Sequence, residues 1–265
     1  MDSSKLTKEK RKALRKASVE IVKGRNDETI LDAARELADL AVPKKKEEPG
    51  RTGLRVSKEY ITEIAMSVRK TMRNKERMRL LVTALWSAGH DEARLLGALI
   101  LAPSLVARDE ETETANIAYV RELLLQTKNQ LVLDALAEAV SDEVEAGRGS
   151  SWMDSMNAWA KESEIRLQTF GLSMYGHLFS RGLSPEKLFD AFQLAKRLLP
   201  TEDPEVAKAI VSMLVSCLKK HEPAVVRFLA KVEHEEGETA EFVWEEISGR
   251  LDAAQEAQPD AELVT

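Results

Sequence analysis

The chain has 265 residues, a formal net charge of −6, and 43% hydrophobic but only 5% aromatic residues. Its longest apolar run, near residues 95–103, is too short to span a bilayer, and no apolar signal segment follows the charged N-terminus, so we expect a cytoplasmic protein without membrane contact. The single cysteine, Cys217, excludes an internal disulfide and fits a reducing compartment.

The charge is divided unevenly along the chain. Residues 1–80 hold 22 Lys and Arg against 13 Asp and Glu, a formal charge of +9, whereas residues 81–265 carry −15. A basic portion of this kind either faces phosphates or forms a solvated helical arm. Ala, Leu, Glu, Lys and Arg dominate the composition, which is typical of a chain that is nearly all helix.

The first 56 residues predict two helices and a loop. Residues 5–23 form a strongly basic helix that Gly24 ends, and residues 28–41 form a helix with a clear apolar stripe. Residues 42–56 are predicted to be a loop rather than a domain boundary. Three consecutive lysines in it, at positions 44–46, either approach a phosphate backbone or are simply solvated.

From residue 57 the chain settles into helical hairpins. Residues 57–71 pair with residues 74–87, and Asn74 is expected to cap the second helix. That helix ends at Gly89, and another begins at once with Asp91 and continues until Pro103 stops it. Two helices joined so closely must fold back on each other, with His90 as a turn residue.

The later hairpins have less specific sequence motifs. Residues 109–113 are predicted to be an acidic loop, and helices are predicted at residues 114–127, 129–144, 163–180, 184–199, 203–220 and 223–250, the last broken near Gly237. Hairpins recur at roughly forty-residue spacing, which is typical of HEAT-like units. We therefore predict an all-α fold: a right-handed solenoid of antiparallel HEAT-like helix pairs, or α-α superhelix. It forms a single domain over residues 1–250, and residues 251–265 form a disordered acidic tail.

The hairpin around Gly89 carries a resemblance to a known family. Trp86 followed by residues 89–96 resembles the Leu-Trp, Gly-x-x-Glu-Ala-Arg-Leu-Leu signature of the AlkD-like DNA alkylation repair glycosylases, which are HEAT-like repeat proteins. Residues 53–57 and the helix after them are similar to the N-terminal part of that family, and the likeness continues weakly to about Lys231. The resemblance implies a basic concave face that holds duplex DNA.

The resemblance also implies a reaction, the release of N3- and N7-alkylated purines by cleavage of the N-glycosidic bond. An alkylated base is cationic and leaves readily, so the protein need only stabilise positive charge that develops on the sugar. A carboxylate near the deoxyribose does this, and aromatic faces contact the lesion.

The family's Trp-Trp-Asp-x-Val-Asp type segment has its best match at residues 151–157. By this resemblance Trp152 and Asp154 match, Met153 replaces the second tryptophan, and Asn157 takes the place of the catalytic Asp. A neutral amide keeps the shape of Asp but cannot place a negative charge beside an oxocarbenium-like centre. Removing one such electrostatic group commonly costs about two to four powers of ten in rate.

Two further family positions also differ here. The family's arginine corresponds either to Arg166, shifted in register, or to Gln168, and a downstream tryptophan corresponds to Ser212 or Ser216. Loss of several functional positions from a retained scaffold signature is the pattern of a fold kept for binding.

Each site residue also has a structural interpretation. Trp152 and Trp159 share one helix face, either as core or as a base-stacking platform. Asp154 either completes a capping box with Ser151 or supplies the missing carboxylate. The side chains His177 and Arg181, four apart, contact phosphate or simply occupy an exposed helix face.

Three functions follow from these patterns. The first is a protein that binds duplex DNA through its concave face with weak or no glycosylase activity. The second is an active alkylpurine glycosylase in which Asp154 acts, and the third is a scaffold whose groove holds a protein partner. Because the sequence has no Cys/His cluster, glycine-rich phosphate loop or nucleophile elbow, we expect neither a metal nor a cofactor. We also expect a monomer.

Overall fold

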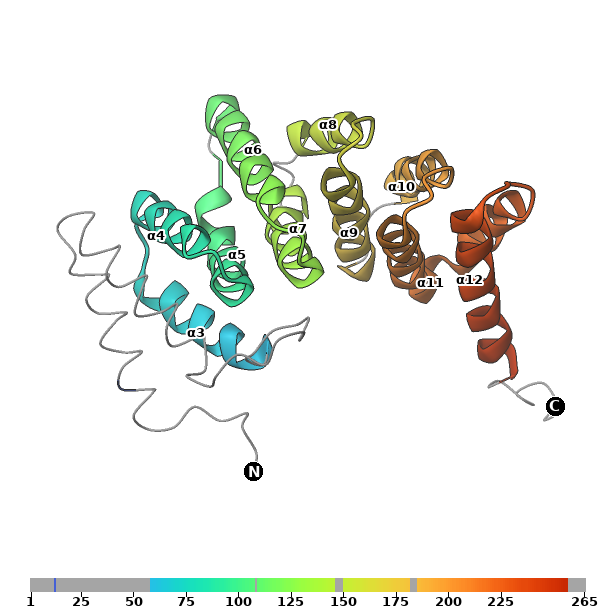
Figure 1. The fold of residues 1–265 in the computed structure, drawn as a ribbon, viewed down its shortest axis with the longest axis horizontal. Helices are drawn as coiled ribbons and strands as arrows, with labels where there is room; N and C mark the ends of the chain where they lie inside the picture. Colours follow the sequence, from blue (N-terminus) through green and yellow to red (C-terminus); the bar gives the residue numbers. More distant parts are fainter. Residues whose placement is uncertain (1–11, 13–57, 108, 146–149, 182–184, 257–265) are drawn as a thin grey trace. The chain divides into compact units, whose positions relative to one another are not determined.

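Helix-forming residues with apolar stripes run through the chain, and the computed structural model places helices throughout the residues that it describes, which are 12, 58–107, 109–145, 150–181 and 185–256 (Figure 1). Within those ranges no strand occurs, so the predicted all-α class is confirmed. The predicted N-terminal helices, the loop at 42–56 and residues 257–265 of the predicted tail lie outside the described residues.

The chain divides into two compact units, Met1–Glu143 and Val144–Thr265. Within each unit, helices pack against neighbours along the chain and against helices one place further along it. A single domain over residues 1–250 and a right-handed course through all of it stay predictions. Each unit is therefore described by itself.

The first unit is built from short helical hairpins. It holds α3 (Lys58–Thr71), α4 (Lys75–Ser87), α5 (Asp91–Leu105), α6 (Glu110–Leu125) and α7 (Gln130–Glu145), whose last two residues fall in the second unit. Helix α5 packs on both α3 and α4. The predicted cap is confirmed, because the side chain of Asn74 accepts a hydrogen bond from the Arg77 backbone N–H at 2.9 Å.

The α4–α5 hairpin is held at close range by a glycine. Gly89 has φ of 83° and ends α4 as predicted, because the left-handed region carries no steric cost for glycine. On α5, a Cβ added to Gly97 would lie 3.2 Å from Cε3 of the buried Trp86 indole. The absence of a side chain at Gly97 therefore lets α5 approach Trp86 on α4 closely.

The charged residues of the same hairpin are also structural. Asp91 accepts a hydrogen bond at 2.9 Å from the Asn129 side-chain amide just before α7, and it lies 3.9 Å from the Arg94 guanidinium. Glu92, next to it, is buried. Since carboxylates in a first turn also complement the helix dipole, this stretch stabilises the start of α5 and joins it to α7.

The second unit is centred on α9. It holds α8 (Ser150–Trp159), α9 (Ile165–Arg181), α10 (Pro185–Leu198), α11 (Pro204–Val232) and α12 (Glu238–Glu256). Helix α9 packs against α8, α10 and α11, and α11 also packs against α12. A kink at His221, with φ of −137° and ψ of 36°, divides α11 at the predicted break, and Gly237, with φ of 120°, separates α11 from α12.

Three predicted boundaries differ from the structure. Helix α5 continues past Pro103 to Leu105, because a proline in the last turn removes only one hydrogen bond before the helix ends. Helix α6 begins at Glu110 rather than at Thr114, since Asp109 caps it and the predicted acidic loop forms its first turn. Helix α12 continues to Glu256, beyond the predicted start of the tail at residue 251.

Candidate functional site

The two tryptophans of α8 belong to the core of the second unit. Trp152 is fully buried and Trp159 is 5% exposed, and the Trp159 ring lies 5.9 Å from the Phe170 ring on α9. Both side chains thus pack α8 against the rest of the unit. A base cannot stack on either ring while it is covered in this way, so the structure favours the core interpretation of these residues over a stacking platform.

The polar side of α8 carries Asp154 and Asn157. Asp154 is exposed and Asn157 is partly exposed. Residues three apart are neighbours on a helix surface, so the carboxylate and the amide lie on the same side of α8. Ser151 is the second residue of α8, so it lies within the helix and not at the cap position that a capping box with Asp154 requires.

Arg166 and Gln168 are engaged where α8 turns into α9. The Nε of Arg166 donates to a carboxylate oxygen of Glu164 at 2.6 Å, and this hydrogen bond raises the pKa of the guanidinium. The amide of Gln168 is buried and donates to the backbone carbonyl of Glu162 at 2.7 Å. Both contacts stabilise the turn. Arg166 and Gln168, the two candidates for the family's arginine, therefore both have a structural role.

The remaining predicted positions lie on α9 and α11. Arg181, at the end of α9, donates to Glu145 at 3.1 Å, and His177 is partly exposed. The hydroxyl of Ser216 lies 3.6 Å from where a Cβ of Gly176 would be, and it donates to the backbone carbonyl of Ser212. The seam between α9 and α11 therefore brings Gly176 and both serines together. The described contacts do not join them to Asp154 or Asn157.

Two basic side chains of α4 that were not among the predicted site residues make contacts within the fold. The Nζ of Lys75 donates to the carbonyl of Val106 at 2.7 Å, and the guanidinium of Arg79 lies 3.5 Å from the carbonyl of Ser104 and 5.7 Å from the centre of the Tyr119 ring. Their spacing of four residues places both on one side of α4, beside the C-terminal end of α5. Positive charge there complements the helix dipole.

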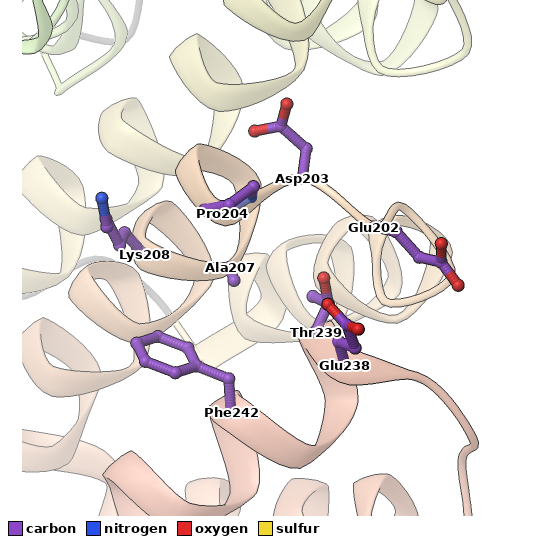
Figure 2. A pocket seen from close by; sticks show the side chains of 8 residues that line it. All are labelled: Glu202, Asp203, Pro204, Ala207, Lys208, Glu238, Thr239 and Phe242. Carbon is purple, nitrogen blue, oxygen red and sulfur yellow. The ribbon is translucent and has the colours of Figure 1, made fainter.

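A cavity of about 270 Å³ lies between the starts of α11 and α12 (Figure 2). Its wall combines the Phe242 ring with carboxylates of Glu202, Asp203 and Glu238. Asp203 is occupied as the cap of α11, where it accepts from the Glu205 backbone N–H at 2.8 Å. Three carboxylates against the single cation of Lys208 make this wall unfavourable for phosphate, and none of the predicted site residues lines it.

The described residues provide neither a metal-binding cluster nor a membrane-spanning helix. No group of three or more His, Cys, Asp or Glu residues in that part of the chain is arranged to hold a metal ion. Among the helices there, none has an apolar stretch long enough to cross a bilayer.

Comparison with known proteins identifies similar chains. The family model described as DNA alkylation repair enzyme matches residues 33–243. Two crystal structures of engineered proteins from the Northeast Structural Genomics Consortium are similar at 17% and 14% identity, with TM-scores of 0.41 and 0.39. They cover 92% and 89% of this chain and 98% of each engineered protein. None of the curated proteins matches the chain.

Proposed function

We propose that this chain, which belongs to the DNA alkylation repair enzyme family, binds duplex DNA through the concave face of its helical stack and has weak or no glycosylase activity. The observation that carries the proposal is Asn157, a partly exposed amide on α8 where the resemblance places the family's catalytic carboxylate. Family membership supports DNA as the ligand. The neutral side chain argues against efficient cleavage.

The environment of Asn157 supports the same conclusion. An oxocarbenium-like centre needs a full negative charge beside it, and an amide offers only a dipole. The buried Trp152 and Trp159 leave the lesion without their aromatic faces, which would otherwise attract a cationic base. Affinity would then come from Lys and Arg on phosphates, with little discrimination for the alkylated base.

Binding is tested by fluorescence anisotropy on two labelled duplexes, one plain and one carrying 7-methylguanine. We expect similar affinities for both duplexes and a steep fall in affinity as salt rises, because phosphate contacts release counterions. Absence of binding to either duplex at roughly 100 μM protein in low salt, the weak end of non-specific affinity, would reject the proposal.

Activity is tested by restoring the carboxylate. We expect Asn157→Asp to release 7-methylguanine faster than the unsubstituted protein, by up to about two to four powers of ten. Asn157→Ala is the matched control, and it should stay as inactive as the starting protein. If the unsubstituted protein already releases base as fast as Asn157→Asp, the amide is not what limits the reaction.

A second function is favoured by one observation, the exposed carboxylate of Asp154 on the same side of α8. In this alternative the chain is an active alkylpurine glycosylase and Asp154 supplies the charge. Three positions along a helix displace a group by about 4.5 Å, so the carboxylate would have to reach the sugar from a shifted position. Base release that disappears in Asp154→Asn but survives in Asn157→Ala would support it.

A further inference from the structure

A groove of about 620 Å³ lies between α10 and the second half of α11, within the second unit. It contains none of the residues discussed for DNA. Its floor includes Phe192 and Phe228, whose rings stack with centroids 5.0 Å apart and planes 21° apart, and the Leu188 and Ala224 side chains extend it. Two helices thus present one continuous apolar strip.

Phe189 stands at this groove with 66% of its surface exposed. A phenylalanine side chain stabilises a protein only where it is buried, so a ring left in water beside an apolar floor contributes little to the fold of the unit. Exposed aromatic rings next to apolar grooves are typical anchors of protein interfaces.

The groove is bordered by positive charge. Lys196 on α10 and Arg227 and Lys231 on α11 line it. Lys196 pairs with Glu235 at 3.0 Å, whereas Arg227 and Lys231 make no ion pair with any residue that the structure describes. The chain as a whole carries −6, so a basic border on an apolar groove is a local reversal of its charge.

We propose that this groove docks an acidic amphipathic helix of a partner protein. Such a helix would lay apolar residues on the floor and against Phe189, and its carboxylates would pair with Arg227 and Lys231. A single-stranded nucleic acid fits less well, because Phe192 and Phe228 stack on each other and do not offer the free ring faces on which successive bases would stack.

The groove's preference is measured by peptide display. A library of peptides of about four helical turns is selected on the full chain and counter-selected on Phe189→Ala. We expect enrichment of Leu, Phe or Trp at i, i+3, i+4 and i+7 with Asp and Glu between them. Enrichment of basic or featureless peptides, or none at all, would overturn the proposal.

Site and charge are separated by titrating the best selected peptide, labelled with fluorescein, against two pairs of variants. Phe189→Ala should weaken binding at least about tenfold, while Phe242→Ala, which removes another exposed ring on α12, should leave it unchanged. Arg227→Glu should weaken it and reduce its salt dependence, while Lys219→Glu, also on exposed α11 surface, should not. Equal loss in a variant and its control would overturn the assignment.

The same variants show whether the groove binds a nucleic acid or a second copy of the chain instead. If labelled oligo-dT binds and Phe189→Ala abolishes that binding while no acidic peptide binds, the groove holds nucleic acid and the proposal is wrong. If sedimentation shows a dimer that Phe189→Ala dissociates, the groove pairs two copies of the chain and the proposal is again wrong. Duplex DNA binding should be unchanged in Phe189→Ala. The proposal for the groove and the proposal of DNA binding can therefore be rejected independently.

Discussion

Gly97 shows how one residue position sets the distance between two helices. A Cβ there would already meet the Trp86 ring at 3.2 Å, so the branched side chain of Gly97→Val has no room on α5. We expect it to destabilise the protein by about 2 kcal/mol, measured by urea unfolding. Gly249→Val on α12 is the control, because nothing lies within 4 Å of that position, and it should be close to neutral. Equal losses would mean that the contact with Trp86 does not matter.

Cys217 is fully buried, and desolvation raises the pKa of its thiol to about 11. The neutral thiol is therefore favoured in the folded state. Since this pKa is raised above the unfolded value of about 8.5, its contribution to stability is present below pH 8.5 and is lost as the pH rises towards 11.

Burial also predicts the reactivity of this thiol. At pH 8, iodoacetamide should label Cys217 much more slowly in the native protein than in urea, because only the exposed thiolate reacts. Labelling is followed by mass spectrometry, and Cys217→Ser should take up no label. Equal rates in native protein and in urea would contradict the burial of this residue.

At the scale of one helix, Asp109 shows how a cap turns an expected loop into a first turn. The Thr112 hydroxyl and the Thr112 backbone N–H both donate to the Asp109 carboxylate and lower its pKa below 3.8, and the backbone contact measures 2.7 Å. Because the folded pKa is depressed, the cap stabilises α6 above the unfolded pKa, and this contribution is lost as the pH falls through the folded value.

The pKa of Asp109 can be read directly. Titration of its side-chain carboxyl by ¹³C NMR should give a midpoint below 3.8. In Thr112→Val the hydroxyl is gone while the backbone N–H remains, so the midpoint should rise but stay below the ordinary value. An unchanged midpoint in that variant would show that the hydroxyl makes no contribution.

The helices could be predicted from the sequence, while three of their ends, in α5, α6 and α12, could not. Apolar stripes, Asn74, Gly89 and Gly237 act locally, so their effects are readable along the chain. The charge of the acidic residues at 109–113 predicts a loop, because the hydrogen bond by which Asp109 caps α6 depends on a backbone conformation that charge alone does not indicate. The continuation of α5 past Pro103 depends on how near the proline lies to the end of the helix.

At the scale of the whole molecule, the family could be predicted from the motif around Gly89, whereas the match of Asn157 to the family's catalytic carboxylate stays a prediction. The packing around α8 could not be predicted. The burial of Trp152 and the engagement of Gln168 with a backbone carbonyl depend on how α8 packs on α9, which involves side chains from different helices. The groove beside Phe189 could not be predicted either, because it forms only where the kink at His221 sets the second half of α11 beside α10.

The unequal charge of the chain gives the last prediction. If the basic first 80 residues hold DNA, the lysines at positions 44–46 neutralise phosphates and displace counterions from the DNA. Replacing all three with Gln should then reduce the magnitude of the slope of log affinity against log salt by about 0.9 for each lysine engaged. The alternative of a solvated loop predicts an unchanged slope. Lys219→Gln with Lys220→Gln, in the acidic remainder of the chain, is the control and should leave the slope as it was. A slope that falls only in this control would place the phosphate contacts in the second unit, where the net charge opposes them.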